Sequence, residues 1–330
     1  MRPIRLAALS LIAGCAPAAI TVAAPDRPAL AFPMACEVGR TCEIQHYVDR
    51  RGGTGVEDYR CGRQTYEAHT GLDVRVPDMA AQGAGVAVLA AASGRVARLR
   101  DGVADISIRA AGAPPVAGQE CGNGVVVDHG GGLETQYCHV ARGSIRVKVG
   151  DRVVAGTPLA RVGLSGNTEF PHLHFNVRQD GKVVDPFSPD PVAKVCATQS
   201  SLWSARALQQ MPYKRGAVLN AGFASGQLDM AAIERGGIPG PTRAAPYVVA
   251  YARAIGLEAG DRLELELFGP DGTRLANDQR DPLESDKAQW FMLVGRKRPP
   301  TGWTAGAYTA EFRVYRNGKV AVSRRFETRL

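Results

Sequence analysis

The chain has 330 residues, a length that favours two domains, and a formal net charge of +8 at pH 7. Its 40 lysines and arginines are spread along the chain, and aromatic residues make up only 6% of it. Without a dense basic run interleaved with aromatics, nucleic acid is excluded as the expected ligand. A diffuse positive surface suits an anionic polymer or lipid surface, and equally well ordinary solubility.

Residues 1–24 have the pattern of an export signal, with two arginines followed by a short apolar run. Cleavage after Ala18 or Ala23 would release a soluble protein. Alternatively, Cys15 closes a lipoprotein-like processing box, and its lipidation would tether the protein to a membrane. We favour plain cleavage, because small and apolar residues continue past Cys15. The sequence therefore predicts an exported protein, periplasmic or secreted.

The cysteines agree with export. The chain has seven, and either processing route removes Cys15 from disulfide chemistry, leaving six (7 − 1) as an even set that favours three disulfides. The sequence contains no Cys-x-x-Cys pair, so the cysteines do not indicate a metal site. We expect Cys121–Cys138, because a hairpin turning near residues 128–131 would place these two opposite each other. Cys36–Cys42 would close a small loop, and Cys61–Cys196 follows by elimination.

The rest of the chain divides into four segments. Residues 25–65 are expected to form an irregular extension, and residues 66–190 contain short β runs separated by glycine turns. Residues 191–212 have the character of a linker with one helical turn. Residues 213–330 contain several short strands with turns between them, typical of a small Ig-like β-sandwich. The predicted fold class is all-β: a compact antiparallel, barrel-like domain followed by the sandwich.

Alternating runs and turn residues carry this prediction. Val125–Val127 and Glu134–His139 flank a glycine turn and form a predicted hairpin, and Ile145–Val149 alternates as a further strand. Near the C-terminus, Arg262–Leu267 alternates strictly. Asn317-Gly318 is a strong signal for a two-residue hairpin turn.

Histidines supply the sharpest chemical signal. In a strand, residues two apart point to the same face, so His172 and His174 would face one site while Leu173 faces the core. A lone pair of this kind is often incidental. The second element is His69 and Asp73.

Four residues of straight strand span roughly 13 Å, too far for His69 and Asp73 to share one metal. The segment must therefore bend, and Gly71 gives it the freedom to do so. A bend would bring His69 and Asp73 together.

Together, His69, Asp73 and His174 offer three protein ligands, and three ligands with one open position are typical of catalytic zinc. Zinc lowers the pKa of bound water to roughly 7. His139 and His172 remain nearby, and either could take a proton from water or stabilise an oxyanion. We interpret His129 as structural and His46 as incidental.

These residues, taken in order, resemble the LytM/lysostaphin-type zinc metallopeptidases, family M23. The resemblance rests on His69-x-x-x-Asp73, Tyr137-x-His139 and His172-Leu-His174-Phe175. Further agreement comes from the segments 122–124, 149–153, 163–167 and 185–186. The resemblance covers about residues 66–190.

The resemblance implies one zinc ion per chain held by His69, Asp73 and His174, with His139 and His172 as catalytic histidines. It implies an endopeptidase that cuts peptide cross-links of bacterial peptidoglycan, with the D-alanyl–diaminopimelate bond expected in a Gram-negative periplasm. Some relatives have lost ligands and only regulate other wall hydrolases, whereas this sequence retains every position. The alternative is a wall-binding regulator, non-catalytic or autoinhibited. The sandwich could bind cell wall or a protein partner, cover the site, or merely stabilise the chain.

Overall fold

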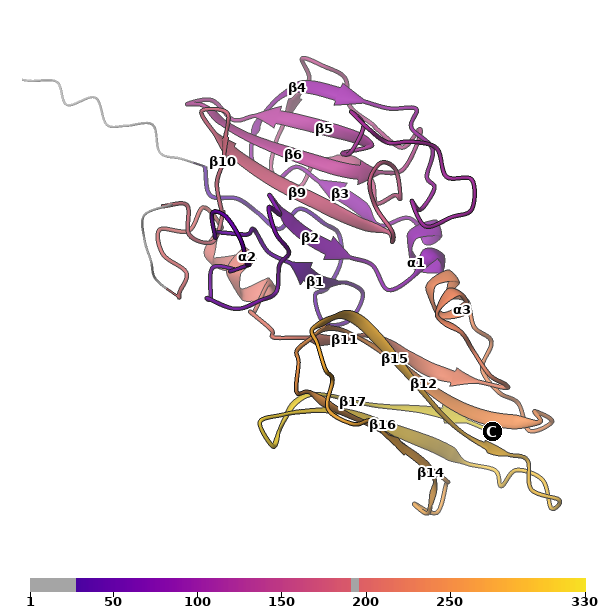
Figure 1. Ribbon diagram of the computed structural model, residues 1–330. Helices are drawn as coiled ribbons and strands as arrows, with labels where there is room; N and C mark the ends of the chain where they lie inside the picture. Colours follow the sequence, from indigo (N-terminus) through magenta and orange to yellow (C-terminus); the bar gives the residue numbers. More distant parts are fainter. Residues whose placement is uncertain (1–27, 191–195) are drawn as a thin grey trace, which may run out of the picture.

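The computed structural model describes residues 28–190 and 196–330. The expected signal segment, Cys15 included, lies outside the described residues. Within them the chain is built mainly from β-strands (Figure 1), with three short helices: α1 (Met79–Ala84), α2 (Ala205–Gln210) and α3 (Met230–Arg235). The all-β prediction is confirmed. No helix in these two ranges combines the length and the hydropathy needed to cross a bilayer.

A large antiparallel sheet forms the first half of the molecule (Figure 1). Its strand order is β1-β2-β9-β6-β5-β4-β7, and β10 pairs with β9. The strands are β1 (Glu43–His46), β2 (Leu72–Arg75), β4 (Gly94–Arg100), β5 (Asn123–Asp128), β6 (Leu133–Val140), β7 (Arg152–Val153), β9 (His172–Gln179) and β10 (Lys182–Val183). A separate two-stranded sheet pairs β3 (Ala87–Leu89) with β8 (Pro158–Arg161).

Strand β9 shows how the sequence sets the two faces of the large sheet. Leu173, Phe175 and Val177 are almost completely buried in the core. His172 and His174 alternate with them and therefore lie on the opposite face, as predicted. The β9 pattern thus places one face of the sheet in the core and leaves the other for the polar site.

The predicted hairpin at residues 125–139 is confirmed as β5 and β6. Its turn contains Gly130, Gly131 and Gly132, each with positive φ, a conformation that glycine adopts without strain. The strand predicted at Ile145–Val149 is wrong. Turns flank this segment, and a single described backbone hydrogen bond, from Arg146 N–H to Leu159 O, joins it to β8, which is too few to form a strand pair.

The core beneath the large sheet extends beyond residues 66–190. It includes Tyr47 and Tyr59 from the preceding segment and Trp203 from the following one. The ring of Tyr59 stacks on Phe187 with the centroids 4.4 Å apart, and Phe187 lies 5.7 Å from Trp203. The segments on both sides of the sheet therefore pack into the same core as the sheet itself.

All three predicted disulfides are present: Cys36–Cys42, Cys61–Cys196 and Cys121–Cys138. The first closes a loop just before β1. The second joins segments 135 residues apart on either side of the large sheet. The third links the start of β5 to the end of β6, as the hairpin argument requires.

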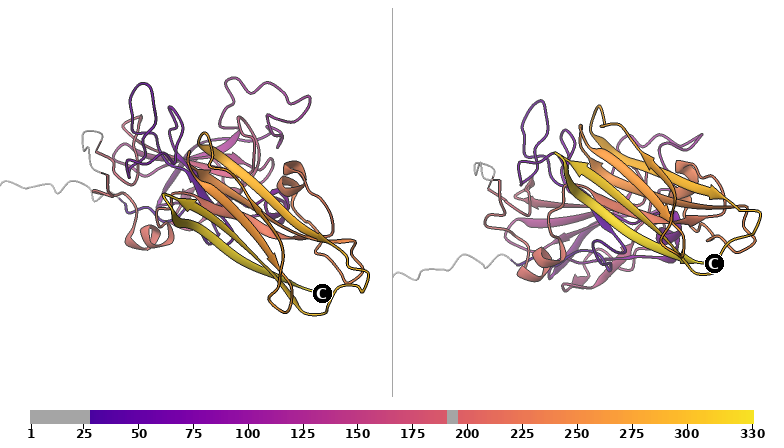
Figure 2. Two further views of the ribbon diagram at one scale, coloured as in Figure 1. Left: turned by 60° about the horizontal axis from the view of Figure 1, so that its bottom comes forward. Right: turned by 90° about the horizontal axis from the view of Figure 1, so that it is seen from below.

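Strands β11–β17 form a sandwich of two antiparallel sheets, called here the C-terminal sandwich (Figure 2). One sheet has the order β11-β12-β15 and the other β14-β13-β16-β17. The strands are β11 (Ala217–Ala224), β12 (Tyr247–Leu257), β13 (Arg262–Phe268), β14 (Arg274–Gln279), β15 (Lys287–Lys297), β16 (Ala307–Arg316) and β17 (Lys319–Arg329). The predicted hairpin turn at Asn317-Gly318 is confirmed, with positive φ at both residues.

Candidate active site

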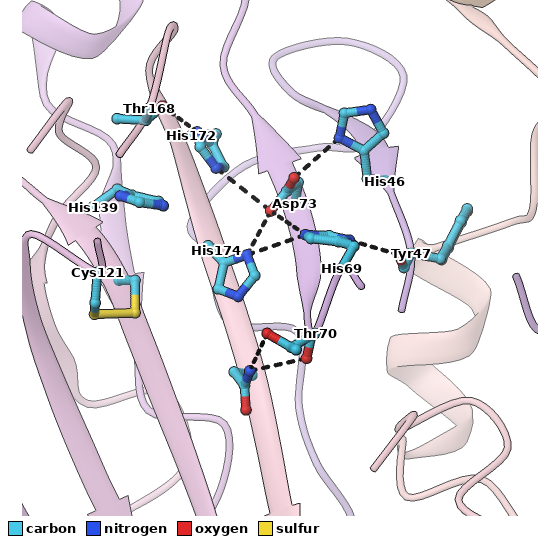
Figure 3. Close-up of polar contacts among 12 residues, drawn as sticks. His46, Tyr47, His69, Thr70, Asp73, Cys121, His139, Thr168, His172 and His174 are labelled. Atoms are coloured by element: carbon cyan, nitrogen blue, oxygen red, sulfur yellow. Dashed lines mark hydrogen bonds and ion pairs between the residues drawn. A yellow bond between two sulfur atoms is a disulfide. The ribbon is translucent and has the colours of Figure 1, made fainter. Parts of the chain in front are cut away.

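Three side chains converge on one point above β2 and β9 (Figure 3). The antiparallel pairing places Asp73 directly opposite His174. Oδ1 of Asp73 lies 2.9 Å from Nδ1 of His174 and 3.2 Å from Nε2 of His69, and these two nitrogens are 3.2 Å apart. His69, Asp73 and His174 thus form a group that can hold a metal ion.

The bend predicted between His69 and Asp73 is present. Gly71 stands where a Cβ atom would approach Nε2 of His174 to 2.6 Å and the carbonyl oxygen of Phe175 to 2.7 Å. Both separations are too short for a real side chain. Gly71 therefore lets the backbone pass close against β9.

His172 faces the same point from the start of β9. Its Nδ1–H is directed to the carbonyl oxygen of Phe170 at 3.0 Å and to Oγ1 of Thr168 at 3.1 Å. A carbonyl oxygen can only accept, so the proton resides on Nδ1. The Nε2 lone pair is left for the site, 3.4 Å from Oδ1 of Asp73.

His139 lies at the end of β6 and is oriented in the same way. Its Nδ1–H donates to the carbonyl oxygen of Ser165 at 2.7 Å, and its ring centroid is 4.6 Å from that of His172. The residue has a left-handed φ of 61°, which is uncommon outside glycine. Its backbone N–H donates to Cys121 O at 2.8 Å, next to the Cys121–Cys138 disulfide. The disulfide therefore lies where this unusual backbone is held.

The electrostatics favour the ionised carboxylate of Asp73 and disfavour the protonated forms of His139 and His174. Burial alone would raise the pKa of Asp73, but His69, His172 and His174 hold that pKa well below its usual value. Burial lowers the pKa of His139 well below the ordinary range, and its histidine neighbours act in the same direction. Burial also lowers the pKa of His174. For His69, burial lowers the pKa but Asp73 outweighs it, so the pKa is raised.

The last residue of strand β1 and the residue after it supply two contacts that the sequence did not reveal. The carbonyl oxygen of Tyr47 accepts Nδ1–H of His69 at 2.7 Å, which leaves Nε2 of His69 facing the metal-holding group. His46, interpreted from the sequence as incidental, places Nδ1 3.0 Å from Oδ2 of Asp73. The signal that could have located both is the pairing of β1 with β2, which the irregular composition of the segment concealed.

His129 has a different environment. Its Nδ1 and Nε2 lie 2.8 Å from the carbonyl oxygen of Ser93 and from Oγ1 of Thr135, respectively. Thr135 in turn bonds the hydroxyl of Tyr137 at 3.0 Å. Both ring nitrogens thus have partners within the fold, in agreement with the structural role predicted for His129.

A cavity of about 700 Å³ opens beside His69. Val48, Val183 and Leu202 contribute apolar surface to it, and Lys182 an exposed cation. Its size is in the range of small-ligand sites. It adjoins the metal-holding group on the His69 side.

The C-terminal sandwich is joined to the large sheet by a buried ionic cluster. Oε2 of Glu234 on α3 accepts from Arg75 at 2.7 Å and also from Arg253 on β12, and both guanidinium groups are fully buried. The guanidinium of Arg75 stacks 3.8 Å from the ring of Phe170, which contacts His172. The sandwich is therefore connected through Arg75 to the segment that orients His172.

Other contacts also join the two parts. They include Arg63–Asp286 and a hydrogen bond from Gln64 to Gly256 O. No hydrogen bond or ion pair that the structure describes joins the sandwich directly to His69, Asp73, His139, His172 or His174.

Comparison with known proteins locates this site within a family. Residues 67–186 match the model described as Peptidase family M23. The match includes all five site residues: His69, Asp73, His139, His172 and His174. The predicted resemblance is confirmed.

Three relatives match parts of this region. The chain is 32% identical over 129 residues to the DD-carboxypeptidase/endopeptidase Mpg of Neisseria meningitidis, which covers 38% of the chain and 23% of Mpg. It is 36% identical over 87 residues to the peptidoglycan DD-endopeptidase ShyB of Vibrio cholerae, a match that covers 26% of the chain and 20% of ShyB. It is 44% identical over 62 residues to the murein hydrolase activator EnvC of Escherichia coli, a match that covers 19% of the chain and 14% of EnvC. The matched segment spans less than a quarter of each relative.

Proposed function

We propose that this chain, whose residues 67–186 match peptidase family M23, is a zinc-dependent endopeptidase that hydrolyses peptide cross-links of bacterial peptidoglycan. The proposed peptidase domain comprises residues 66–190, between the extension at 25–65 and the linker at 191–212. The C-terminal sandwich, residues 213–330, is a second domain in this proposal.

One observation carries the proposal: five side chains from three strands and one bend direct their free ring nitrogens and one carboxylate oxygen toward a common point. The proposed ligands are His69, Asp73 and His174. The proposed catalytic residues are His139 and His172, whose Nδ1–H groups are fixed by main-chain carbonyls. A protein that had lost catalysis would have no need to hold both Nε2 atoms toward the site.

The donor set fits zinc. A tetrahedral site with metal–ligand distances of about 2.0–2.2 Å has neighbouring ligand atoms roughly 3.3–3.6 Å apart. The three separations among Asp73 Oδ1, His69 Nε2 and His174 Nδ1 are 2.9, 3.2 and 3.2 Å, so the three atoms would move slightly apart around a bound ion. Two imidazoles and one carboxylate are also ligands that zinc accepts readily. When bound, zinc would supply Lewis-acid chemistry, polarising the scissile carbonyl and activating water near neutral pH.

The chain's own residues would then move the protons. Nε2 of one catalytic histidine accepts the proton of the attacking water and returns it to the departing amine. The other, when it carries a proton on Nε2 as well as on Nδ1, donates a hydrogen bond to the oxygen that becomes negatively charged. The ring separation of 4.6 Å between His139 and His172 lets both reach one tetrahedral centre. The cavity beside His69 offers space for part of the peptide.

The relatives support the substrate class. Mpg and ShyB carry endopeptidase in their names, and ShyB is named for peptidoglycan. We therefore propose the D-alanyl–diaminopimelate cross-link as the bond cut. Three disulfides suit an oxidising compartment, so we propose export to the periplasm or beyond, with membrane attachment only through lipidated Cys15.

The second candidate is a regulator of other wall hydrolases, which the EnvC match favours. In that case the C-terminal sandwich would bind a protein partner, or shield the site until one arrives. The intact set of five residues supports the enzyme instead.

The test is cleavage of purified cross-linked muropeptide dimers, followed by mass spectrometry, with and without a zinc chelator. Chelator-sensitive conversion of dimers to monomers is the expected result, and the fragment masses identify the bond. His139→Ala, loaded with zinc to the same extent, is the matched inactive control. If the folded, zinc-loaded protein converts no dimer but stimulates a second purified wall hydrolase, the regulator is the correct reading.

A further inference from the structure

We propose that His46 is a positioning residue for the metal site: it holds the carboxylate of Asp73 so that Oδ1 faces His69 and His174. This inference rests on the proposed function, because it concerns the zinc that the site would bind. His46 precedes the family match at residues 67–186. The histidine is therefore a feature of the segment that this chain adds in front of the matched domain.

The two oxygens of Asp73 have separate partners (Figure 3). Oδ2 lies 3.0 Å from Nδ1 of His46. Oδ1 lies 2.9 Å from His174 and 3.2 Å from His69. Because the ionised carboxylate only accepts hydrogen bonds, Nδ1 of His46 must donate. This bond prevents rotation of the carboxylate and reserves one oxygen for a metal.

The backbone brings His46 to this position through a local irregularity. Strand β1 pairs antiparallel with β2, with Ile44 opposite Val74 and His46 opposite Asp73. The register shifts between Ile44 and His46, as in a β-bulge. Bulges redirect side chains near active sites. The shift puts His46 and Asp73 side by side at the edge of the sheet.

His46 is itself held in place. Its ring meets the ring of Tyr66 edge-on, with the centroids 5.2 Å apart and the planes at 88°, and it lies 5.8 Å from the ring of His69. Only 15% of its side chain is exposed. The adjacent Tyr47 accepts from His69 through its carbonyl oxygen. Two consecutive residues therefore orient two of the three proposed ligands.

A histidine that merely completes its own hydrogen bonding would leave metal affinity unchanged when replaced. Replacing a histidine that orients a ligand would weaken metal binding, because groups that hold metal ligands typically account for about 10–100-fold in affinity. Asparagine and glutamine separate the two cases. The amide nitrogen of asparagine can occupy the position of Nδ1, whereas that of the longer glutamine corresponds to Nε2.

The experiment measures the zinc dissociation constant of the full chain by competition with a fluorescent chelator. The variants are His46→Ala, His46→Asn and His46→Gln, with His129→Ala as the matched control at a histidine remote from the site. We expect His46→Ala and His46→Gln to bind zinc about 10–100-fold more weakly. His46→Asn should recover most of the affinity, and His129→Ala should match the wild type.

Wild-type affinity in a folded His46→Ala protein overturns the inference and leaves the proposed function intact. If His46→Ala does not fold, equal affinities of the asparagine and glutamine variants overturn it. A wild-type chain that binds no zinc overturns the proposed function together with this inference.

Discussion

Replacing Glu234 by glutamine tests the buried cluster that joins the C-terminal sandwich to the large sheet. The side chain keeps its shape but loses its charge. Its Oε2 accepts from Arg75 and from Arg253, whose guanidinium groups are both fully buried. The substitution therefore leaves two buried cations without their shared counter-ion.

Removing one partner of a buried ion pair costs about 3–5 kcal/mol, because the remaining charge stays away from water. Two features move the expectation toward the lower end. Glu234 is 21% exposed, and Arg75 keeps a hydrogen bond to Gln45 at 2.9 Å. Arg253 also keeps one to Asn220 at 3.2 Å. We expect the free energy of unfolding to fall by about 3 kcal/mol.

The assay is urea unfolding followed by tryptophan fluorescence, which samples Trp203 in the first core and Trp303 in the sandwich. The matched control is Glu37→Gln, which breaks an exposed pair with Arg40 and should cost about 0.5 kcal/mol or less. A loss for Glu234→Gln no larger than that of the control would refute the reasoning.

Three further predictions concern the site and its frame. His139→Ala should lower dimer cleavage by about 10²–10⁴-fold while zinc stays bound, whereas His174→Ala should lose zinc. Metal analysis alongside the cleavage assay distinguishes the two variants, and equal loss of zinc in both would contradict the assigned roles. Replacing Cys121 and Cys138 by serine should lower the free energy of unfolding by about 3 kcal/mol, measured by thermal or urea unfolding. An unchanged unfolding midpoint would contradict a stabilising role for this disulfide. Burial raises the pKa of Asp185 to about 7, so the folded state binds the extra proton and stability falls as pH rises from about 4 through 7. Asp185→Asn should flatten that decline in unfolding measured across this range, and identical pH profiles would count against it.

Local rules were sufficient where the chemistry depends on neighbouring residues. The alternation of a strand placed His172 and His174 on one face and Leu173 in the core. Turn preferences located the hairpin at Asn317-Gly318. Gly71 marked the bend that brings His69 to Asp73, although its tight approach to β9 could not be read from the chain.

Features that depend on distant partners could not be predicted in this way. His46 gained its contact only because β1 adds to the edge of β2 with a register shift. Ile145–Val149 alternates like a strand, yet a single described backbone hydrogen bond joins it to β8. Arg75 and Glu234 lie 159 residues apart, so no local pattern relates them.

The pairing of β2 with β9 also has a consequence for the order of folding. Asp73 and His174 are 101 residues apart in the chain and become neighbours only when these two strands pair. Contacts of such long range form slowly, because the entropy cost of closing a large loop must be met before the contacts can stabilise the chain. In the proposed peptidase, metal binding would therefore be a late event, and an incompletely folded chain would not cleave its surroundings. The topology would delay the proposed activity until the sheet is complete.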